Sequence, residues 1–248
     1  METLGKHSPR VKELRRRVRD RRPGEVVVDG RRLVADLIRW GVPLRELYLE
    51  AGVEPDPEIV TAAGSVWALD SRVLSDISPT RHPQGVLAVV DEPTLKPWSG
   101  TSGVALYLDG IQDPGNLGAI VRSAAALGGS AVLLSPQSAD PFHPASVRGS
   151  AGAVFRLPIE RDASLTRAAD RIAVGGGEVW ASGTSGHPID VWRPTEPVLL
   201  LLGAEGAGIS GPALEASQGT VVVPLGREVE SLNVAVAAGI VLEHLRSK

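Results

Sequence analysis

A run of five apolar residues, from Val198 to Leu202, constrains the fold of this chain more than any other feature. A strand with one side in water alternates polar and apolar residues, so an unbroken apolar run indicates a strand covered on both faces. Helical patterns at 117–127, 165–173 and 234–245 alternate with further strand-like stretches. This alternation predicts an α/β fold with a parallel sheet. The other predicted strands of this half are 104–108, 131–134, 154–159, 179–181 and 221–223.

The first half of the chain predicts a second, smaller α/β block of about 70 residues, which is large enough to fold alone. Between two of its strands lies a helix that ends near Gly41. Residues 92–103 are rich in Pro, Gly, Ser and Thr, which is typical of a linker. We therefore expect a basic arm over 1–22, a small domain over 23–91 and a larger domain over 104–248. The predicted strands of the small domain are 25–28, 44–49, 66–69 and 86–90.

Basic residues concentrate at the start of the chain. Residues 1–22 contain nine Lys and Arg against three Asp and Glu, whereas the whole chain has a net charge of −3. Such a concentration is an electrostatic footprint for phosphate, but a solvated, partly disordered tail has the same composition. We predict a helix from Pro9 to about Arg21, and charge alone leaves both interpretations open.

The composition excludes several classes of site. The chain has no cysteine, so it has no disulfide, thiolate zinc site, iron–sulfur cluster or cysteine nucleophile. Its five histidines lack metal-ligand spacing, and neither a phosphate loop nor a nucleophile elbow occurs. No stretch approaches the ~20 apolar residues of a membrane span. We therefore expect a cytoplasmic protein without a metal site or a membrane segment.

The first candidate segment for chemistry joins a strand to a helix. The strand ends at Asp109, a Pro-Gly turn follows, and Asn116 is placed to cap the helix. Arg122 lies off the buried stripe of that helix, so it faces solvent or a cleft. A capped helix with a surface arginine is the simpler interpretation. The position after a parallel strand favours function, because α/β sheets carry their sites there.

The second segment runs from Gly203 to Gly211 and is rich in glycine. Formally it contains GxGxxG with acidic residues about 20 positions later, which is a dinucleotide-binding pattern. Pro212 and the short stretch behind it leave little room for the crossover helix that such a site needs. The other interpretation is a bend that brings backbone atoms close to a ligand, with Glu205 at the edge of the pocket.

The third segment is a strand at 221–223, a turn, and a helix that ends at about Arg246. This helix is apolar almost all round, so we expect it to be buried. Ser231 and Asn233 would then be polar groups at the start of a buried helix, where such groups need partners. Capping would satisfy one of them, whereas a ligand or another segment would satisfy both.

Together and in this order, the three segments resemble the SpoU (TrmH) family of RNA ribose methyltransferases. Further similarity lies at 31–33, 83–87 and 150–153, so the resemblance covers nearly the whole chain. One departure is visible, because residues 225–227 (Leu-Gly-Arg) stand where many relatives have Met, a small residue and Gly. The residues that carry the resemblance are Asn116, Gly118 and Arg122; Gly203, Glu205, Gly206 and Gly208; and Pro224, Ser231, Leu232, Asn233 and Val234.

The resemblance implies a deep trefoil knot in the C-terminal domain and an L30e-like RNA-binding fold in the N-terminal domain. It implies that S-adenosylmethionine binds in the knotted loops, largely through main-chain groups. It also implies a homodimer with active sites near the subunit interface. The expected cofactor-binding residues are Leu202, Gly203, Gly208, Val223, Leu225 and Leu232.

The activity that the resemblance implies is methyl transfer from S-adenosylmethionine to a ribose 2′-hydroxyl of RNA. We expect 23S rRNA as the target, because a separate N-terminal domain is typical of such relatives. The family assigns removal of the hydroxyl proton to Arg122, but a guanidinium scarcely deprotonates. Arg122 could instead hold a phosphate and stabilise the developing alkoxide. The expected catalytic residues are Asn116, Arg122, Glu205, Ser231 and Asn233.

Three alternatives stay open at this point. One is a tRNA 2′-O-methyltransferase, which differs only in its target. Another is an NAD-dependent oxidoreductase built on the glycine-rich segment. The last is a non-catalytic RNA-binding relative.

Overall fold

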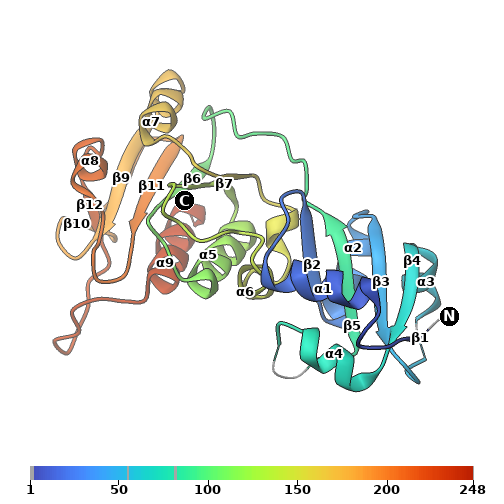
Figure 1. Cartoon of the computed structure of the whole chain (residues 1–248). Helices are drawn as coiled ribbons and strands as arrows, with labels where there is room; N and C mark the ends of the chain where they lie inside the picture. The colour runs from blue at the N-terminus through green and yellow to red at the C-terminus, as the bar shows by residue number, and fades with distance from the viewer. Residues whose placement is uncertain (1–2, 55, 81–82, 248) are drawn as a thin grey trace. The chain divides into compact units, whose positions relative to one another are not determined.

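The structure is a computed structural model of the chain and describes residues 3–54, 56–80 and 83–247. Its internal contacts divide the chain into two compact units, whose elements can be followed in Figure 1. The first unit comprises Met1–Thr94 and Phe142–Phe155, and the second comprises Leu95–Pro141 and Arg156–Lys248. The domain bounds expected from the sequence stay a prediction.

Within the described residues, the first unit has a five-stranded mixed sheet in the order β1-β4-β3-β5-β2. β1, β4 and β3 are parallel, whereas β5 is antiparallel to both β3 and β2. The strands are β1 (Thr3–Leu4), β2 (Glu25–Asp29), β3 (Leu44–Glu50), β4 (Ala63–Leu69) and β5 (Val86–Asp91). The helices are α1 (Pro9–Arg19), α2 (Arg31–Arg39), α3 (Pro57–Thr61), α4 (Ser71–Ile77) and α6 (Pro144–Gly149).

Helix α1 is part of the core of the first unit. Its apolar residues Val11 and Leu14 are fully buried in a cluster with Tyr48 and Leu87 of the sheet. Six of the basic residues also form ion pairs within the unit, so over the described residues this segment is not the disordered tail that charge alone left open as one interpretation. These arginines are Arg10, Arg16, Arg17, Arg19, Arg21 and Arg22, and their acidic partners are Glu13, Asp20, Glu25, Glu46 and Glu92.

The segment Phe142–Phe155 packs with the first unit, although we expected it in the larger domain. Helix α6 lies against β2, and a 3₁₀ turn (Ala153–Phe155) follows it. Gly152 has a φ of +81°, and a Cβ there would lie 2.5 Å from Leu33 Cδ1 and 2.9 Å from the Trp40 ring. A glycine is therefore required for this loop to close on α2. The predicted strand at 154–159 is wrong for its first part, because the chain turns there.

Within the described part of the second unit, seven strands pair in the order β10-β12-β9-β11-β6-β7-β8. Every pairing is parallel, which confirms the predicted sheet. The implied knot stays a prediction, because strand order does not say how the chain is threaded. The strands are β6 (Val104–Asp109), β7 (Gly129–Leu134), β8 (Ile159–Glu160), β9 (Glu178–Gly183), β10 (His187–Pro188), β11 (Val198–Gly203) and β12 (Thr220–Val222).

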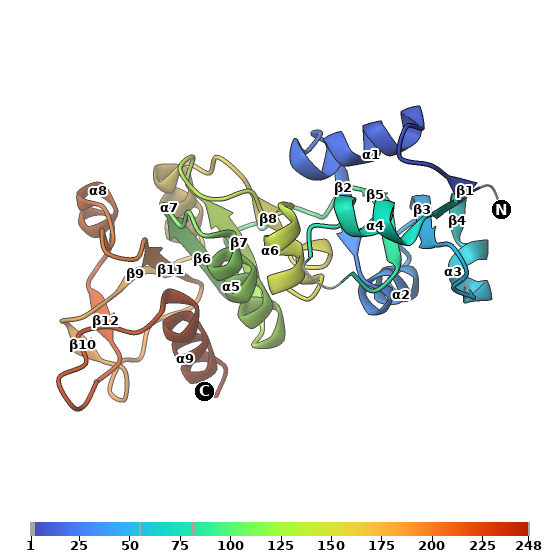
Figure 2. The same cartoon turned by 60° about the horizontal axis from the view of Figure 1, so that its bottom comes forward.

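Helices cover both faces of the second sheet. α5 (Pro114–Ala126) and α9 (Val234–Arg246) lie side by side (Figures 1 and 2). α7 (Leu165–Val174) packs Ile172 against Leu199 and Leu201, whereas Leu200 and Leu202 point to the opposite face and are equally buried. This two-sided burial is the reason for the apolar run of β11. The short α8 (Gly211–Glu215) completes the unit.

The stretch expected as a linker, 92–103, lies largely in the second unit. Trp98 is buried in the core beside α7. Its carbonyl accepts a hydrogen bond of 3.2 Å from Arg171 Nη1, and the same guanidinium lies 5.7 Å from its ring. The Pro and Gly residues here thus indicate turns rather than a loose connection.

Candidate active site

The carboxyl ends of four neighbouring strands meet at one edge of the second sheet, because all its pairings are parallel. The loops after β9, β11 and β12 enclose a cavity of about 1070 Å³. Ligands of α/β proteins usually bind at this edge. The cavity is lined by residues 182–184, 202–206, 208, 209, 222–225, 229–234 and 237.

Three polar side chains from the three sequence segments meet at the edge of this cavity, where Glu205 and Asn233 line it and Asn116 contacts both of them from α5. Asn116 Nδ2 donates to Glu205 Oε1 at 3.0 Å, and Asn233 Nδ2 donates to the same oxygen at 2.8 Å. Asn233 Nδ2 also lies 2.9 Å from Asn116 Oδ1. The expectation that another segment supplies a partner holds for Asn233, whereas for Ser231 it stays a prediction. We call Asn116, Glu205 and Asn233 the polar trio.

Asn233 also caps helix α9. Its Oδ1 accepts from the backbone N–H of Ala235 at 2.9 Å and of Val236 at 3.4 Å. The capping fixes its side chain, so the Nδ2 group is held toward Glu205. Capping and partnership with another segment, which we treated as alternatives, are both present in one residue.

Helix α5 begins earlier than predicted. Its N-cap is Asp113, whose carboxylate accepts from Asn116 N at 2.7 Å, so Asn116 lies inside the first turn. The prediction that Asn116 is the cap is wrong, because Pro114 occupies the first helical position and Asp113 precedes it. The shift leaves the Asn116 side chain available for Glu205.

The loop that carries Glu205 is tightly tied. Gly208 N donates to Ala204 O at 2.8 Å, which closes the loop on itself. A Cβ on Gly203 would lie 2.2 Å from the carbonyl carbon of Gly208, so only glycine fits there. Asp109 Oδ2 accepts from Ser210 N at 2.8 Å and anchors the far end of the loop to β6. These contacts fix the backbone on which Glu205 stands.

The loop between β12 and α9 is more open. Leu225 and Val229 line the cavity yet are 38% and 53% exposed, so they offer apolar surface that a ligand would cover. Arg227 has a φ of +58° and does not line the cavity. Many relatives have glycine at this position according to the resemblance, and the left-handed backbone explains that preference.

Arg122 lies apart from the cavity. It is exposed on α5, as its place off the buried stripe predicted, and it does not line the cavity. Ser231 does line the cavity and is exposed. The structure thus brings together every expected site residue except Arg122.

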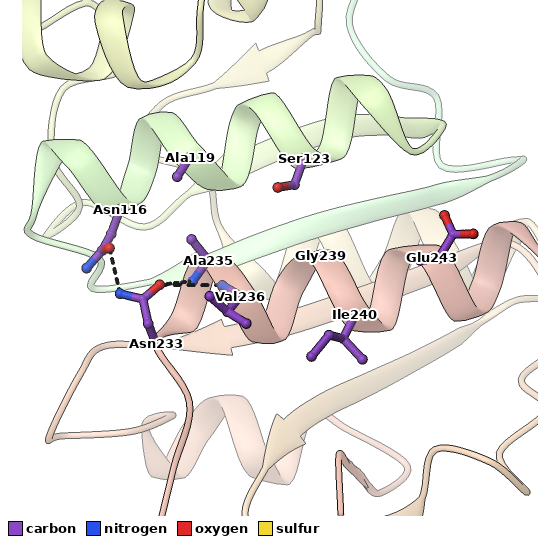
Figure 3. A pocket seen from close by; sticks show the side chains of 9 residues that line it. All are labelled: Asn116, Ala119, Ser123, Asn233, Ala235, Val236, Gly239, Ile240 and Glu243. Atoms are coloured by element: carbon purple, nitrogen blue, oxygen red, sulfur yellow. Dashed lines mark hydrogen bonds between the residues drawn. The ribbon is translucent and has the colours of Figure 1, made fainter.

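A second hollow lies on the surface between α5 and α9, with a volume of about 630 Å³. Figure 3 shows the small side chains of Ala119 and Ser123 on α5 facing α9. Val236 and Ile240 of α9 are 51% and 38% exposed at its edge. The prediction that α9 is wholly buried is therefore wrong, because this face has no neighbour within the described chain.

Comparison with known families identifies the chain. The model of the SpoU rRNA Methylase family matches residues 103–243, and that of the MRM3-like substrate binding domain matches residues 9–88. The chain belongs to the SpoU family. It is an S-adenosylmethionine-dependent RNA ribose 2′-O-methyltransferase.

Relatives of this SpoU protein match over nearly their whole length. The 23S rRNA (guanosine(2553)-2′-O)-methyltransferase RlmP of Bacillus subtilis is 32% identical, with 89% of this chain and 88% of RlmP covered. An AdoMet-bound rRNA methyltransferase from Sinorhizobium meliloti superposes with a TM-score of 0.84 at 27% identity, covering 99% and 97% of the two chains. AviRb from Streptomyces viridochromogenes, in complex with AdoMet, gives 0.81 at 25% identity and covers 97% and 98%.

Family membership overturns the two alternatives of a different class. The glycine-rich segment leads into the five-residue α8 instead of a long crossover helix, so the NAD-dependent oxidoreductase is wrong. The non-catalytic relative is wrong as well.

Among the described residues, no group of three or more His, Cys, Asp or Glu could hold a metal, and no helix is long and apolar enough to cross a membrane.

Sequence reasoning missed several residues that shape this SpoU site. Asp109 and Asp113 were seen as a strand end and part of a turn, although they anchor the Glu205 loop and cap α5. Glu230 and the loop after β9 also line the cavity. An Asp directly before a Pro could have indicated the cap, because Pro favours the first helical position, whereas the Asp109 contact depends on the pairing of β6 with β11.

Proposed function

We propose that this enzyme methylates a ribose in 23S rRNA. The polar trio at the edge of the cavity carries the proposal for the site, because it joins all three segments at one place. The rRNA target is supported by RlmP, which matches both units, and by the substrate-binding match in the first unit. Such a substrate would place the protein in the cytoplasm.

Mapping of ribose methylation in a deletion strain tests the target. One 23S rRNA position should lose its 2′-O-methyl group and regain it when the gene is restored. Loss confined to tRNA would instead establish the tRNA alternative.

We place S-adenosylmethionine in the large cavity, and the residues there fit it. The apolar side chains of Leu202, Val223, Leu225 and Leu232 offer walls for its uncharged parts, and the glycine backbone at Gly203 allows close approach. When bound, this cofactor supplies a methyl group on a positively charged sulfur. Gly208 and Ser231 complete the set of contacts that we assign to the bound molecules.

We further propose that the chain works as a homodimer through the hollow between α5 and α9. Small side chains at its floor allow a second helix to approach, and the exposed Val236 and Ile240 would be covered. Light scattering should give twice the 26.0 kDa chain mass. Ile240→Arg should give the monomer, and an unchanged dimer would move the interface elsewhere.

The dimer also explains the place of Arg122. We place the two-fold axis near Ala119, so that the two copies of α5 run antiparallel past each other. Residue 122 of one copy would then lie opposite residue 116 of the other. Arg122 of the second copy would then hold an RNA phosphate beside the polar trio. Arg122→Ala should abolish methyl transfer while S-adenosylhomocysteine binding persists, and wild-type turnover would remove Arg122 from the mechanism.

RNA phosphates should contact the first unit through arginines that have no internal partner. Among the described residues, Arg31 and Arg32 at the start of α2 are exposed and form no ion pair, unlike Arg16. The double variant with Gln at 31 and 32 should reduce the salt dependence of RNA binding by about 1.5 in log–log slope. Arg16→Gln is the control and should change it less.

A further inference from the structure

The loop between β12 and α9 contains a tight turn with an unusual backbone. The turn is closed by Val229 N, which donates to Gly226 O at 3.3 Å. Its two central residues, Arg227 and Glu228, have φ values of +58° and +59°. A turn with positive φ at both central positions normally has Gly, Asn or Asp there. Arginine and glutamate in these positions hold a left-handed backbone that residues with a Cβ disfavour.

This turn stands at the rim of the cofactor cavity. Leu225, directly before the turn, and Val229, its last residue, both line the cavity. Arg227 and Glu228 at the tip are exposed and do not line it. Strain of this kind clusters at ligand sites, where the function of the strained residue compensates for its cost. A surface arginine in an ordinary backbone has no such cost, so the strain distinguishes Arg227 from the other exposed arginines.

The charges around the cavity show what Arg227 adds. It is the single basic residue in the three loops that enclose the cavity, against three acidic residues. RNA carries a negative charge at every nucleotide, so loops with a net negative charge repel it unless a cation at the rim offsets them. The loops are 184–186, 204–210 and 223–233, and their acidic residues are Glu205, Glu228 and Glu230.

We propose that Arg227 binds a backbone phosphate of the RNA next to the ribose that enters the cavity. The inference rests on the proposed function, since it needs an RNA ribose at this site. The ribose must reach the cofactor, whereas the charged phosphate beside it stays at the rim, where Arg227 lies. The planar fork of N–H donors on a guanidinium matches the oxygens of a phosphate. Arg227 thus binds substrate on the cofactor's own chain, in addition to the phosphate contact that we assign to Arg122.

The test compares Arg227→Gly with Glu228→Gly in the full-length chain, with an unmodified 23S rRNA transcript as the substrate. Both substitutions relieve a left-handed residue of the same turn, but they remove opposite charges. We expect Arg227→Gly to raise KM for the transcript by about fivefold to tenfold and to keep kcat within about twofold. The plot of log KM against log salt concentration should become shallower by about 0.7, the value for one lost phosphate contact to single-stranded RNA. Glu228→Gly should not raise KM.

Further measurements separate the charge of Arg227 from a structural role. Arg227→Lys keeps the charge and should restore the salt dependence of the wild type. Arg227→Gly should melt no lower than the wild type in circular dichroism, because glycine fits a positive φ. Its dissociation constant for S-adenosylhomocysteine, measured by calorimetry, should stay within about threefold.

Two results would overturn the proposal. One is an equal rise in KM for Glu228→Gly and Arg227→Gly, which would assign the effect to the shape of the turn. The other is a wild-type KM and salt dependence in Arg227→Gly, while the wild type itself methylates the transcript. If the wild type binds S-adenosylhomocysteine but methylates no 23S rRNA, the proposed function itself fails, and this role is withdrawn with it.

Discussion

Two polar clusters of this enzyme are each built around a glutamate, but they differ in how many of its carboxylate oxygens are occupied by donors. In the first unit, Glu46 of β3 receives Tyr48 and Arg17, the latter at 3.0 Å, and Arg10 lies 3.6 Å away. In the second unit, Glu205 receives two amides on a single oxygen. The side chains of Glu46 and Arg17 are only 18% and 12% exposed under α1, whereas Glu205 is exposed and faces a cavity.

The difference shows in the titration of the first cluster. Burial alone would raise the pKa of Glu46, but the hydrogen bonds from Tyr48 and Arg17 outweigh it and hold the pKa below its ordinary value. Burial and the neighbouring Glu46 both raise the pKa of Tyr48. A cluster whose groups satisfy each other on both oxygens stabilises a fold, whereas one that leaves an oxygen open can do chemistry.

We expect the largest effect from a substitution that displaces the backbone of the loop that carries Glu205. Gly203→Ala places a Cβ where the Gly208 carbonyl lies, so the loop that carries Glu205 must move. We expect the dissociation constant for S-adenosylhomocysteine to rise by about 100-fold, equivalent to about 3 kcal/mol. Gly211→Ala is the matched control, because a Cβ there meets nothing within 4 Å. Similar affinities for the two variants in calorimetry would show that the loop is not rigid.

The next largest effect is expected from removing the Glu46 carboxylate of the first cluster, which should lower the stability of the protein. Glu46→Ala leaves Tyr48 without its acceptor under α1 and removes the strongest hydrogen bond of Arg17, which keeps its ion pairs with Glu13 and Glu25. The free energy of unfolding should fall by about 2 kcal/mol, as expected for partly buried groups left unpaired. Urea denaturation followed by circular dichroism measures this loss. Affinity for S-adenosylhomocysteine at low temperature should be unchanged, and a change there would mean that the two clusters are coupled.

The pH dependence sharpens the same contrast. Because the pKa of Glu46 is lower in the folded state, its contribution to stability is complete above its unfolded value of about 4.3. That contribution is lost as the pH falls through the lower folded value. The stability difference between the wild type and Glu46→Gln should therefore be constant from pH 7 to about 5 and shrink below about pH 4. A difference that grows on acidification would contradict this sign.

The smallest effect tests the anchor of the Glu205 loop. Asp109→Ala removes the acceptor for Ser210 N, whereas Asp109→Asn keeps an oxygen there. We expect about a fivefold loss of S-adenosylhomocysteine affinity for Ala, equivalent to the roughly 1 kcal/mol of one hydrogen bond, and a smaller loss for Asn. Faster hydrogen exchange at Ser210 N should accompany the loss. Equal effects of Ala and Asn would argue that Asp109 acts through its charge.

Local pattern determined much of this protein. The unbroken apolar run of β11 predicted a sheet covered on both faces, and helical spacing predicted that Arg122 would be exposed. These inferences succeed because side-chain period and burial are properties of a short segment. The order of the three polar segments was equally readable, and it carried the resemblance to the family.

Tertiary structure alone decided which groups meet. Asn116 is 89 residues from Glu205 and 117 from Asn233 in the sequence, and they touch because β6 and β11 are adjacent and α5 lies beside α9. The same reason applies to α1, whose arginines suggested a free basic arm until the acids of the sheet were placed beneath them. The partners of charged and hydrogen-bonding groups are set by neighbours in space, so the spacing of residues within one helix or strand does not predict them.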